Sequence, residues 1–211
     1  MSRRISRRDL AAAEYGKAKN RLEALERKLA LHFRQMLLGV IEWDTALRVN
    51  AWNPAAEAIF GYSGEEALGR SARELILPAD VLGQIDIVWD NLLKLKGGEY
   101  NTNKNLTRDG RIILCEWFNT PLVDSDGTIV GVMSLVRDIT ERRRIEEALQ
   151  LSENRYRTMF ETTGAATVMI EANTVITLVN SEFERLTGYT REETEGKLSW
   201  TILIPWEEEQ R

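Results

Sequence analysis

The sequence predicts an α+β fold: a five-stranded antiparallel sheet with short helices and one longer helix, preceded by an N-terminal coiled-coil helix. Three observations predict it. Apolar residues alternate around a turn near residue 45, three further strand-like runs are separated by Asp-Gly turns, and a helical period lies between these two groups. The first 38 residues show a helical period of their own.

Residues 9–38 predict a long helix, because they contain no proline and are rich in Ala, Leu, Glu, Lys and Arg. Apolar residues recur at alternating steps of three and four, which is the seam of a coiled coil of two or more chains. The alternative is that this seam packs on its own domain. The predicted dimer seam consists of Tyr15, Leu22, Leu25, Leu29 and Met36.

From Gly39 the period changes to two, and residues 40–43 and 47–52 predict a β-hairpin. Asn53-Pro54 predicts a helix start, because Asn caps backbone N–H groups and Pro has no N–H to leave unpaired. A short helix is expected to Phe60, and apolar residues at helical spacing predict a longer one over Asp80–Leu95.

Three strands are predicted after Gly97-Gly98, at residues 99–107, 111–123 and 128–139. The segments between them contain Asp-Gly, which is a strong hairpin signal. Successive strands joined by tight turns form an antiparallel meander, and the first hairpin adds two more strands.

The chain nearly repeats itself at an offset of 127 positions, and this predicts two domains in series. The match includes the preceding helix. It covers Asn53, Glu57, Gly61, Tyr62, Glu65, Glu66, Gly69 and Pro78, which recur as Asn180, Glu184, Gly188, Tyr189, Glu192, Glu193, Gly196 and Pro205, and Leu22, Glu26 and Phe33, which recur as Leu149, Glu153 and Phe160.

The repeat predicts an N-terminal coiled-coil helix at 1–32, a complete domain at 33–140, a linker helix at 141–158 and the front half of a second domain at 159–211. Nothing in the second copy matches residues 81–138. We therefore expect the chain to be a fragment of a longer protein.

Composition excludes several classes of function. The net charge is −5, although the first 28 residues hold nine Lys or Arg against four Asp or Glu, so a nucleic-acid partner is disfavoured. The cluster Arg3, Arg4, Arg7 and Arg8 fits a solvated helix face better than a phosphate or lipid contact. No apolar run reaches the ~20 residues of a membrane span, so a cytoplasmic location is expected, with any anchor outside these residues.

Residue counts also limit the chemistry. With Cys115 as the one cysteine and His32 as the one histidine, the chain has no internal disulfide, and no metal site is predicted. The sequence contains no Walker loop and no nucleophile paired with a base. We therefore expect no enzyme activity within this chain.

Several motifs together resemble the Per-Arnt-Sim (PAS) sensor family, and their order and spacing carry the resemblance. The first domain matches whole and the second matches its front half. The motifs are Asn53-Pro54-Ala55, Phe60-Gly61-Tyr62-Ser63, Glu65-Glu66-Ala67-Leu68-Gly69, Thr107-Arg108-Asp109-Gly110, Cys115 to Leu122, Asp126-Gly127 and Arg137-Asp138-Ile139-Thr140-Glu141-Arg142, which resembles the family's Asp-Ile-Thr ending before a signalling helix.

The resemblance implies a pocket between the inner sheet face and the long helix, although no cofactor can be named. Flavin-adduct relatives carry a reactive Cys in a Gly-Arg-Asn-Cys-Arg stretch, and Ala72 stands in its place here. Haem-binding relatives use a His on the long helix, and Asp80–Leu95 has none. Both flavin-adduct chemistry and haem are therefore disfavoured.

Alternate residues of a strand face opposite sides of the sheet. Comparison with flavin-binding relatives places Cys115, Trp117 and Asn119 on the inner side. The alternative to a ligand pocket is a collapsed core with Asn105 and Asn119 near its rim. Ile85 and Trp89 are expected to face the pocket from the helix, and the alternative for both is plain core. The pocket candidates are Ile85, Trp89, Asn105, Cys115, Trp117, Asn119, Val132, Ser134 and Val136.

The side chains that alternate with these and face the outer side of the sheet are also apolar, so the upstream helix or a partner subunit is expected to cover this outer face. It comprises Leu114, Phe118, Met133 and Leu135. Asp138 and Thr140 are expected to form the junction between sheet and linker helix, with Thr140 as helix cap; the alternative for Asp138 is a solvated strand end.

These patterns predict a signal-sensing and dimerisation module of a signal-transduction protein. Its expected partners are a second copy of the chain, a small-molecule ligand and an output domain of the parent. That parent is expected to be a sensor histidine kinase or a cyclic-dinucleotide enzyme. The rival hypotheses are a ligand-free interaction module and a redox or cofactor sensor using Cys115.

Overall fold

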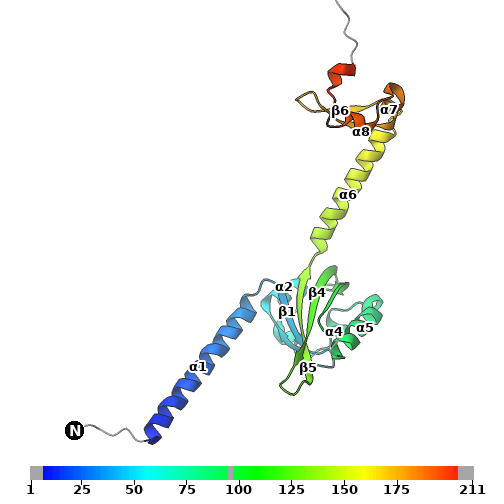
Figure 1. The fold of residues 1–211 in the computed structure, drawn as a ribbon. Coiled ribbons are helices and arrows are strands. Elements are labelled where there is room, and N and C mark those ends of the chain that lie inside the picture. Colours follow the sequence, from blue (N-terminus) through cyan, green and yellow to red (C-terminus); the bar gives the residue numbers. More distant parts are fainter. Residues whose placement is uncertain (1–6, 95–96, 204–211) are drawn as a thin grey trace, which may run out of the picture. The chain divides into compact units, whose positions relative to one another are not determined.

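A computed structural model describes residues 7–94 and 97–203, which form two compact units divided after Arg142 (Figure 1). The first unit contains α1 (Arg7–Gln35), β1 (Gly39–Trp43), β2 (Val49–Trp52), α2 (Pro54–Phe60), α3 (Gly64–Ala67), α4 (Ala72–Leu75), the 3₁₀ turn η1 (Ala79–Val81), α5 (Leu82–Leu93), β3 (Glu99–Leu106), β4 (Ile112–Val123) and β5 (Ile129–Asp138). The helix α6 (Thr140–Glu161) follows, and then β6 (Val168–Ile170), β7 (Ile176–Val179), α7 (Ser181–Thr187), α8 (Arg191–Thr194) and η2 (Trp200–Leu203).

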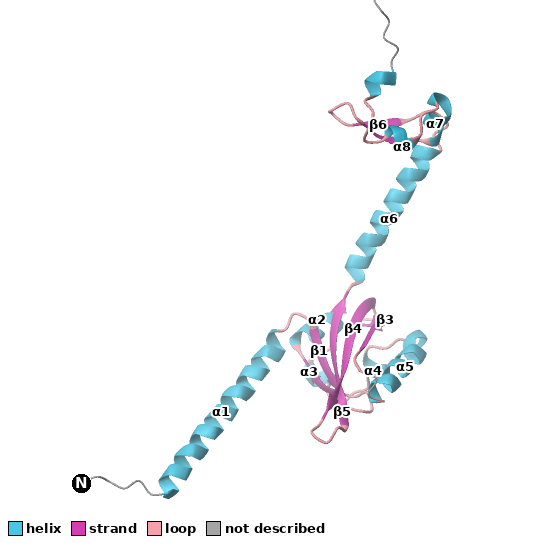
Figure 2. Cartoon of the chain, viewed as in Figure 1, coloured by secondary structure: helices cyan, strands magenta, loops and turns pink. Residues whose placement is uncertain are grey.

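The first unit is built on a five-stranded antiparallel sheet of order β2-β1-β5-β4-β3, which confirms the predicted fold class. The last strand of the first unit, β5, lies in the centre, between β1 and β4. It therefore contacts both halves of the sheet before the chain continues into α6. Figure 2 shows α4 and α5 beside one face of this sheet, which is the inner face of the unit.

Several predicted helix bounds differ from the structure. The linker helix predicted at 141–158 is α6 and spans Thr140–Glu161, and the long helix predicted from Asp80 starts as η1 and continues as α5 from Leu82. α5 ends at Leu93, and the predicted end at Leu95 lies outside the described residues. α1 ends at Gln35, so Met36 of the predicted seam follows the helix. Pro205 of the sequence repeat also lies outside the described residues.

The core of the first unit lies between the inner sheet face and helices α2, α4 and α5. Phe60 is fully buried at its centre, with the ring of Trp52 at 5.3 Å and that of Trp117 at 6.0 Å between centroids. Aromatic rings at such distances add stabilisation beyond the area that they bury. This aromatic cluster fixes β2, α2 and β4 relative to one another.

Asn53 joins the end of α1 to the sheet and to α2. Its side-chain oxygen accepts hydrogen bonds from the backbone N–H groups of Ala56, at 2.9 Å, and Val40, at 2.8 Å. Its Nδ2 donates to the carbonyl groups of Phe33, at 3.2 Å, and Leu38, at 3.0 Å. The side chain is completely buried, so one residue satisfies four backbone groups.

Asn180 repeats this arrangement in the second unit. It accepts from the N–H groups of Phe183 and Thr167 and donates to the carbonyl groups of Phe160 and Ala165, at 2.8–3.0 Å. The sequence repeat is therefore a structural repeat, and it includes the last turn of the incoming helix. We call these two residues the joint asparagines.

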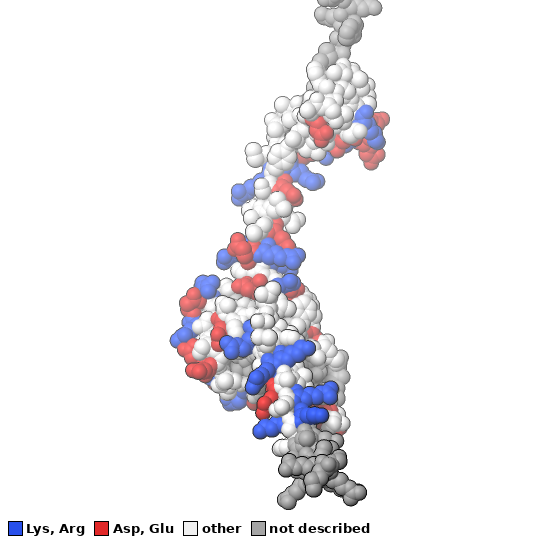
Figure 3. All heavy atoms as spheres, turned by 90° about the vertical axis from the view of Figure 1, so that its left-hand side faces the viewer, with Lys and Arg blue, Asp and Glu red and all other residues white. Residues whose placement is uncertain are grey.

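On the face seen in Figure 3, Lys and Arg outnumber Asp and Glu over α1, and both signs are mixed elsewhere. Among the described residues, the structure contains no helix with the length and hydrophobicity needed to cross a membrane.

Candidate functional site

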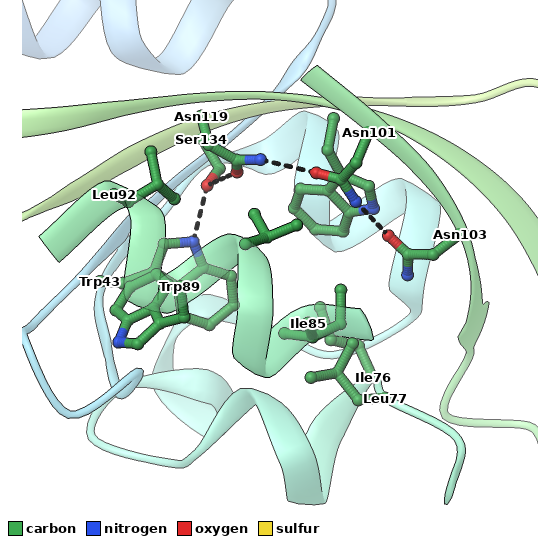
Figure 4. Close-up of a pocket in the computed structure, with 12 residues that line it drawn as sticks. Trp43, Ile76, Leu77, Ile85, Trp89, Leu92, Asn101, Asn103, Asn119 and Ser134 are labelled. Carbon is green, nitrogen blue, oxygen red and sulfur yellow. Dashed lines mark hydrogen bonds between the residues drawn. The ribbon is translucent and has the colours of Figure 1, made fainter. Parts of the chain in front are cut away.

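A cavity of about 40 Å³ lies between α5 and the inner face of the sheet. The sheet contributes amides, a hydroxyl and indoles, and the helical side contributes mainly aliphatic side chains (Figure 4). Its walls are formed by Trp43, Ile76, Leu77, Ile85, Val88, Trp89, Leu92, Asn101, Asn103, Trp117, Asn119 and Ser134.

A continuous chain of side-chain hydrogen bonds crosses this inner face, and three of its bonds join neighbouring strands. Trp43 of β1 donates to Ser134 of β5 at 2.9 Å, and Ser134 donates to Asn119 of β4 at 2.6 Å. Asn119 then donates to Asn101 of β3 at 2.9 Å (Figure 4). The hydrogen-bond chain comprises, in order, Trp43, Ser134, Asn119, Asn101, Asn103 and Asn105.

Along β3 the chain continues in the same direction to the segment that precedes α5. Asn101 donates to Asn103 at 2.8 Å, Asn103 to Asn105 at 3.1 Å, and Asn105 to the carbonyl of Ile76 at 3.1 Å. An indole N–H can only donate and a carbonyl can only accept, so the two ends fix the direction of every amide between them. Hydrogen bonds aligned head to tail strengthen one another in a buried setting.

The indole N–H groups at the cavity are all committed to protein acceptors. Trp117 donates to Asn105 Oδ1 at 3.1 Å, and Trp89 donates to the carbonyl of Thr45 at 3.2 Å. The bond from Trp89 ties α5 to the turn between β1 and β2.

Five of the nine predicted pocket residues line the cavity: Ile85, Trp89, Trp117, Asn119 and Ser134. The other four are buried in the same unit without lining it. They are Asn105, Cys115, Val132 and Val136. Asn105 nevertheless belongs to the hydrogen-bond chain, so it acts on the cavity through its neighbours.

Sequence reasoning missed seven lining residues, and most of them carried a usable signal. Asn101 and Asn103 have the parity of Asn105 on one strand, and Trp43 lies opposite the inward-facing Val132. Helical spacing from Ile85 and Trp89 reaches the two missed residues of α5. The complete set is Trp43, Ile76, Leu77, Val88, Leu92, Asn101 and Asn103; Ile76 and Leu77 follow α4 in a segment with no period.

Cys115 is fully buried on β4, where it pairs with Asp138. Burial raises the pKa of its thiol far above the ordinary value, and the negative charge of Asp138 adds to this rise. The thiolate is the reactive form of cysteine, so the raised pKa disfavours the redox hypothesis.

The predicted junction residues form a compact set of bonds where β5 becomes α6. Asp138 Oδ1 accepts from the backbone N–H of Thr140 at 2.8 Å and from its hydroxyl at 2.5 Å. The Thr140 hydroxyl accepts from the N–H of Leu114 on β4 at 2.8 Å. We expected this hydroxyl to cap the helix, whereas it bonds the start of α6 to the neighbouring strand.

The outer sheet face is partly uncovered in the single chain. Phe118 and Met133 are 42% and 37% exposed, while Leu114 and Leu135 are half-buried. The ring of Tyr100 lies 5.2 Å from that of Phe118 and extends the apolar surface.

The predicted seam of α1 is also exposed in the single chain, which does not support packing on its own domain. The exposed fractions range from 48% to 75%. These residues are Tyr15, Leu22, Leu25, Leu29 and Met36.

Comparison with known proteins agrees with this architecture. Family profiles described as PAS fold match residues 33–144 and residues 154–204. The sensor protein FixL of Bradyrhizobium diazoefficiens is 24% identical over 82% of this chain. DgcE of Escherichia coli, named as a probable diguanylate cyclase, is 28% identical over 79% of it.

The chain spans only 35% of the length of FixL and 15% of that of DgcE. A solved PAS domain from Colwellia psychrerythraea shares 25% identity, with a TM-score of 0.51, over 56% of this chain and 98% of that domain. A second profile of the same fold follows along the chain, at residues 154–204. Since the first profile covers more than half of the chain, including the whole five-stranded sheet, the chain belongs to the PAS family.

Proposed function

We propose that the first unit senses a small molecule in the cavity beneath α5 and passes the change to α6. The observation that carries this proposal is the hydrogen-bond chain. Asn101, Asn103 and Asn119 present polar groups to a cavity whose other walls are apolar, which is the usual constitution of a small-molecule site.

The route to α6 follows from the register of the sheet. Asn119 and Ser134 lie opposite each other on β4 and β5, and β5 ends at Asp138. A ligand that alters the bond between Asn119 and Ser134 changes the packing of these strands. Because Thr140 is bonded to both strands, such a change reaches the first turn of α6 as a shift between populations.

We further propose that the chain acts as a homodimer and that α6 leads toward an output domain. Exposed apolar residues on α1 and on the outer sheet face support a dimer. The named functions of FixL and DgcE support a histidine kinase or a diguanylate cyclase as the output, outside these residues.

A second function, a ligand-free interaction module, is favoured by one observation. The cavity of about 40 Å³ is far smaller than the roughly 300–1,000 Å³ of typical small-molecule sites. Under this hypothesis the hydrogen-bond chain only specifies the packing of the core.

Mass analysis of the molecules released on denaturing the purified protein separates the two functions. A released small molecule, or a thermal shift with a member of a metabolite panel, supports sensing. If no molecule is released and no compound shifts the melting temperature, the interaction module is supported instead.

The relay is tested separately with Thr140→Val, which removes the hydroxyl that bonds Leu114 and Asp138. We expect faster amide exchange in the first turn of α6, with ligand binding retained. Thr158→Val is the matched control, because the hydroxyl of Thr158 donates to the carbonyl of Asn154 within the same helix. Equal exchange in the two variants would contradict the relay.

A further inference from the structure

The walls of the cavity are free of charge. Among the described residues that line it, none carries an ionisable group: the polar atoms belong to amides, one hydroxyl and indoles. An ion that enters such a site loses its hydration without gaining an opposite charge, which is costly in a protein interior. The walls therefore select against acids and amines in their ionised forms.

The hydrogen bonds already made at the cavity leave mainly acceptor positions. A primary amide has two N–H donors and two lone pairs on its oxygen. Asn103 spends both donors, on Asn105 and on the carbonyl of Lys104, and accepts once. Asn119 likewise spends both donors, on Asn101 and on the carbonyl of Glu99, and accepts once.

Asn101 donates once and accepts once, so it keeps one donor and one acceptor. The indoles of Trp43, Trp89 and Trp117 have each donated their N–H to a protein acceptor. The three cavity asparagines thus retain three acceptor positions against a single donor.

We infer that the cavity takes a small uncharged molecule that donates hydrogen bonds through N–H or O–H groups, such as a primary amide, a urea or a polyol. This inference rests on the proposed sensing function and specifies its ligand class. The volume of about 40 Å³ admits roughly three water-sized groups, so the recognised part of the ligand is small.

Four isosteric probes test this inference on the whole chain: acetamide, acetone, acetate and acetamidinium. Acetamide is neutral with N–H donors, acetone is neutral without donors, acetate is an anion and acetamidinium is a cation with donors. The readout is the side-chain N–H resonances of Asn101, Asn103 and Asn119. We expect saturable shifts with acetamide. The other three should bind at least about tenfold more weakly, because acetone has no N–H donor and acetate and acetamidinium are charged.

Asn101→Asp places a carboxylate in the wall with almost no change in shape. We expect this variant to prefer acetamidinium to acetamide by about tenfold. Asn50→Asp makes the same replacement at an exposed position of β2 and is expected to leave the order of the probes unchanged. If Asn101→Asp fails to fold, the affinities of the four probes for the wild-type chain test the inference without it.

Equal or tighter binding of acetate or acetamidinium to the wild-type chain overturns the uncharged class while sensing stands. Equal binding of acetone overturns the requirement for donors. If none of the four shifts these resonances at concentrations up to about 0.1 M, where a ligand this small should bind a site built for it, the inference is overturned. The mass analysis described above then decides separately whether the sensing function also fails.

Discussion

At the scale of the residue, each of the joint asparagines stabilises its surroundings by bonding several backbone groups with one side chain. Asn53 is buried and bonds four backbone groups, and its side-chain oxygen is an acceptor for the N–H groups of Val40 and Ala56. Substitution leaves the N–H groups of Val40 and Ala56 buried without acceptors. Unsatisfied buried groups cost more than the net gain of a typical hydrogen bond.

Asn53→Leu should therefore destabilise the first unit by about 2–4 kcal/mol, from the lost cap and the unsatisfied donors. Urea unfolding followed by tryptophan fluorescence measures this loss. Asn50→Leu on the same hairpin is exposed and should stay within about 0.5 kcal/mol of the wild type. Similar losses in the two variants would show that Asn53 has no special role.

Asp109 gives a second prediction at this scale, on the turn between β3 and β4. The hydroxyl of Thr107 donates to Asp109 at 2.5 Å, and Arg111 Nε donates to it at 2.7 Å. These bonds, with the charge of Arg111, lower the pKa of the Asp109 carboxyl from 3.8 to about 2. Since the folded state lowers this pKa, the stabilisation is complete above pH 3.8 and is lost as the pH falls toward 2.

An NMR titration of the Asp109 carboxyl should show a midpoint near pH 2. In Thr107→Val the midpoint should rise toward the ordinary value, because the hydrogen bond from Thr107 is the largest cause of the shift. An unchanged midpoint in this variant would assign the shift to Arg111 instead.

At the scale of the element, α5 packs on the core mainly through side chains that are only partly buried, namely Leu82, Ile85, Val88 and Trp89. Of its side chains, only Leu92 is fully buried. Its polar ties to the rest of the unit include the bond from Trp89 to Thr45 and the bond from Asn91 to Glu99, at 3.1 Å. Elements with few buried apolar contacts open at low free energy.

Hydrogen exchange should therefore be faster in α5 than in β4. Trp89→Phe keeps most of the apolar area and removes the bond to Thr45, so exchange in α5 should rise about fivefold, which corresponds to about 1 kcal/mol. Ile87→Ala serves as the control, because Ile87 is 66% exposed on the same helix. An equal rise in the control would show that the bond from Trp89 to Thr45 does not restrain α5.

Local signals explain why most elements could be predicted from the sequence. Asn53-Pro54 marked the start of α2, and Asp-Gly marked both hairpins of the meander. These signals act over a few residues and need no knowledge of the fold. The size of the cavity and the contribution of Ile76 and Leu77 depend on how α4 and α5 pack across the sheet, which no local pattern encodes.

The role of Thr140 shows the same limit at a junction. A threonine before an acidic residue is a common helix cap, and this predicted its position at the start of α6. Besides the nearby Asp138, its hydroxyl bonds Leu114, which lies 26 residues earlier in the sequence on a neighbouring strand. Only the register of β4 against β5 brings the two together.

At the scale of the whole molecule, the exposed seam on α1 predicts self-association. Leu22→Glu combined with Leu29→Glu places like charges in the predicted seam, so a dimer should dissociate. Sedimentation velocity should then give half the mass of the wild type. Leu31→Glu is the control, because Leu31 is exposed on the same helix outside the seam. A monomeric wild type, or equal dissociation in the control, would contradict this prediction.

The joint asparagines have a practical consequence for dissecting the protein. A fragment that starts at Gly39, where the sheet begins, would strip Asn53 of the carbonyl groups of Phe33 and Leu38. Cutting before the final turn of α1 would keep both acceptors, and Phe160 sets the same limit for the second unit. The smallest fragment that can be excised or recombined intact is therefore a sheet together with the last turn of the helix that precedes it.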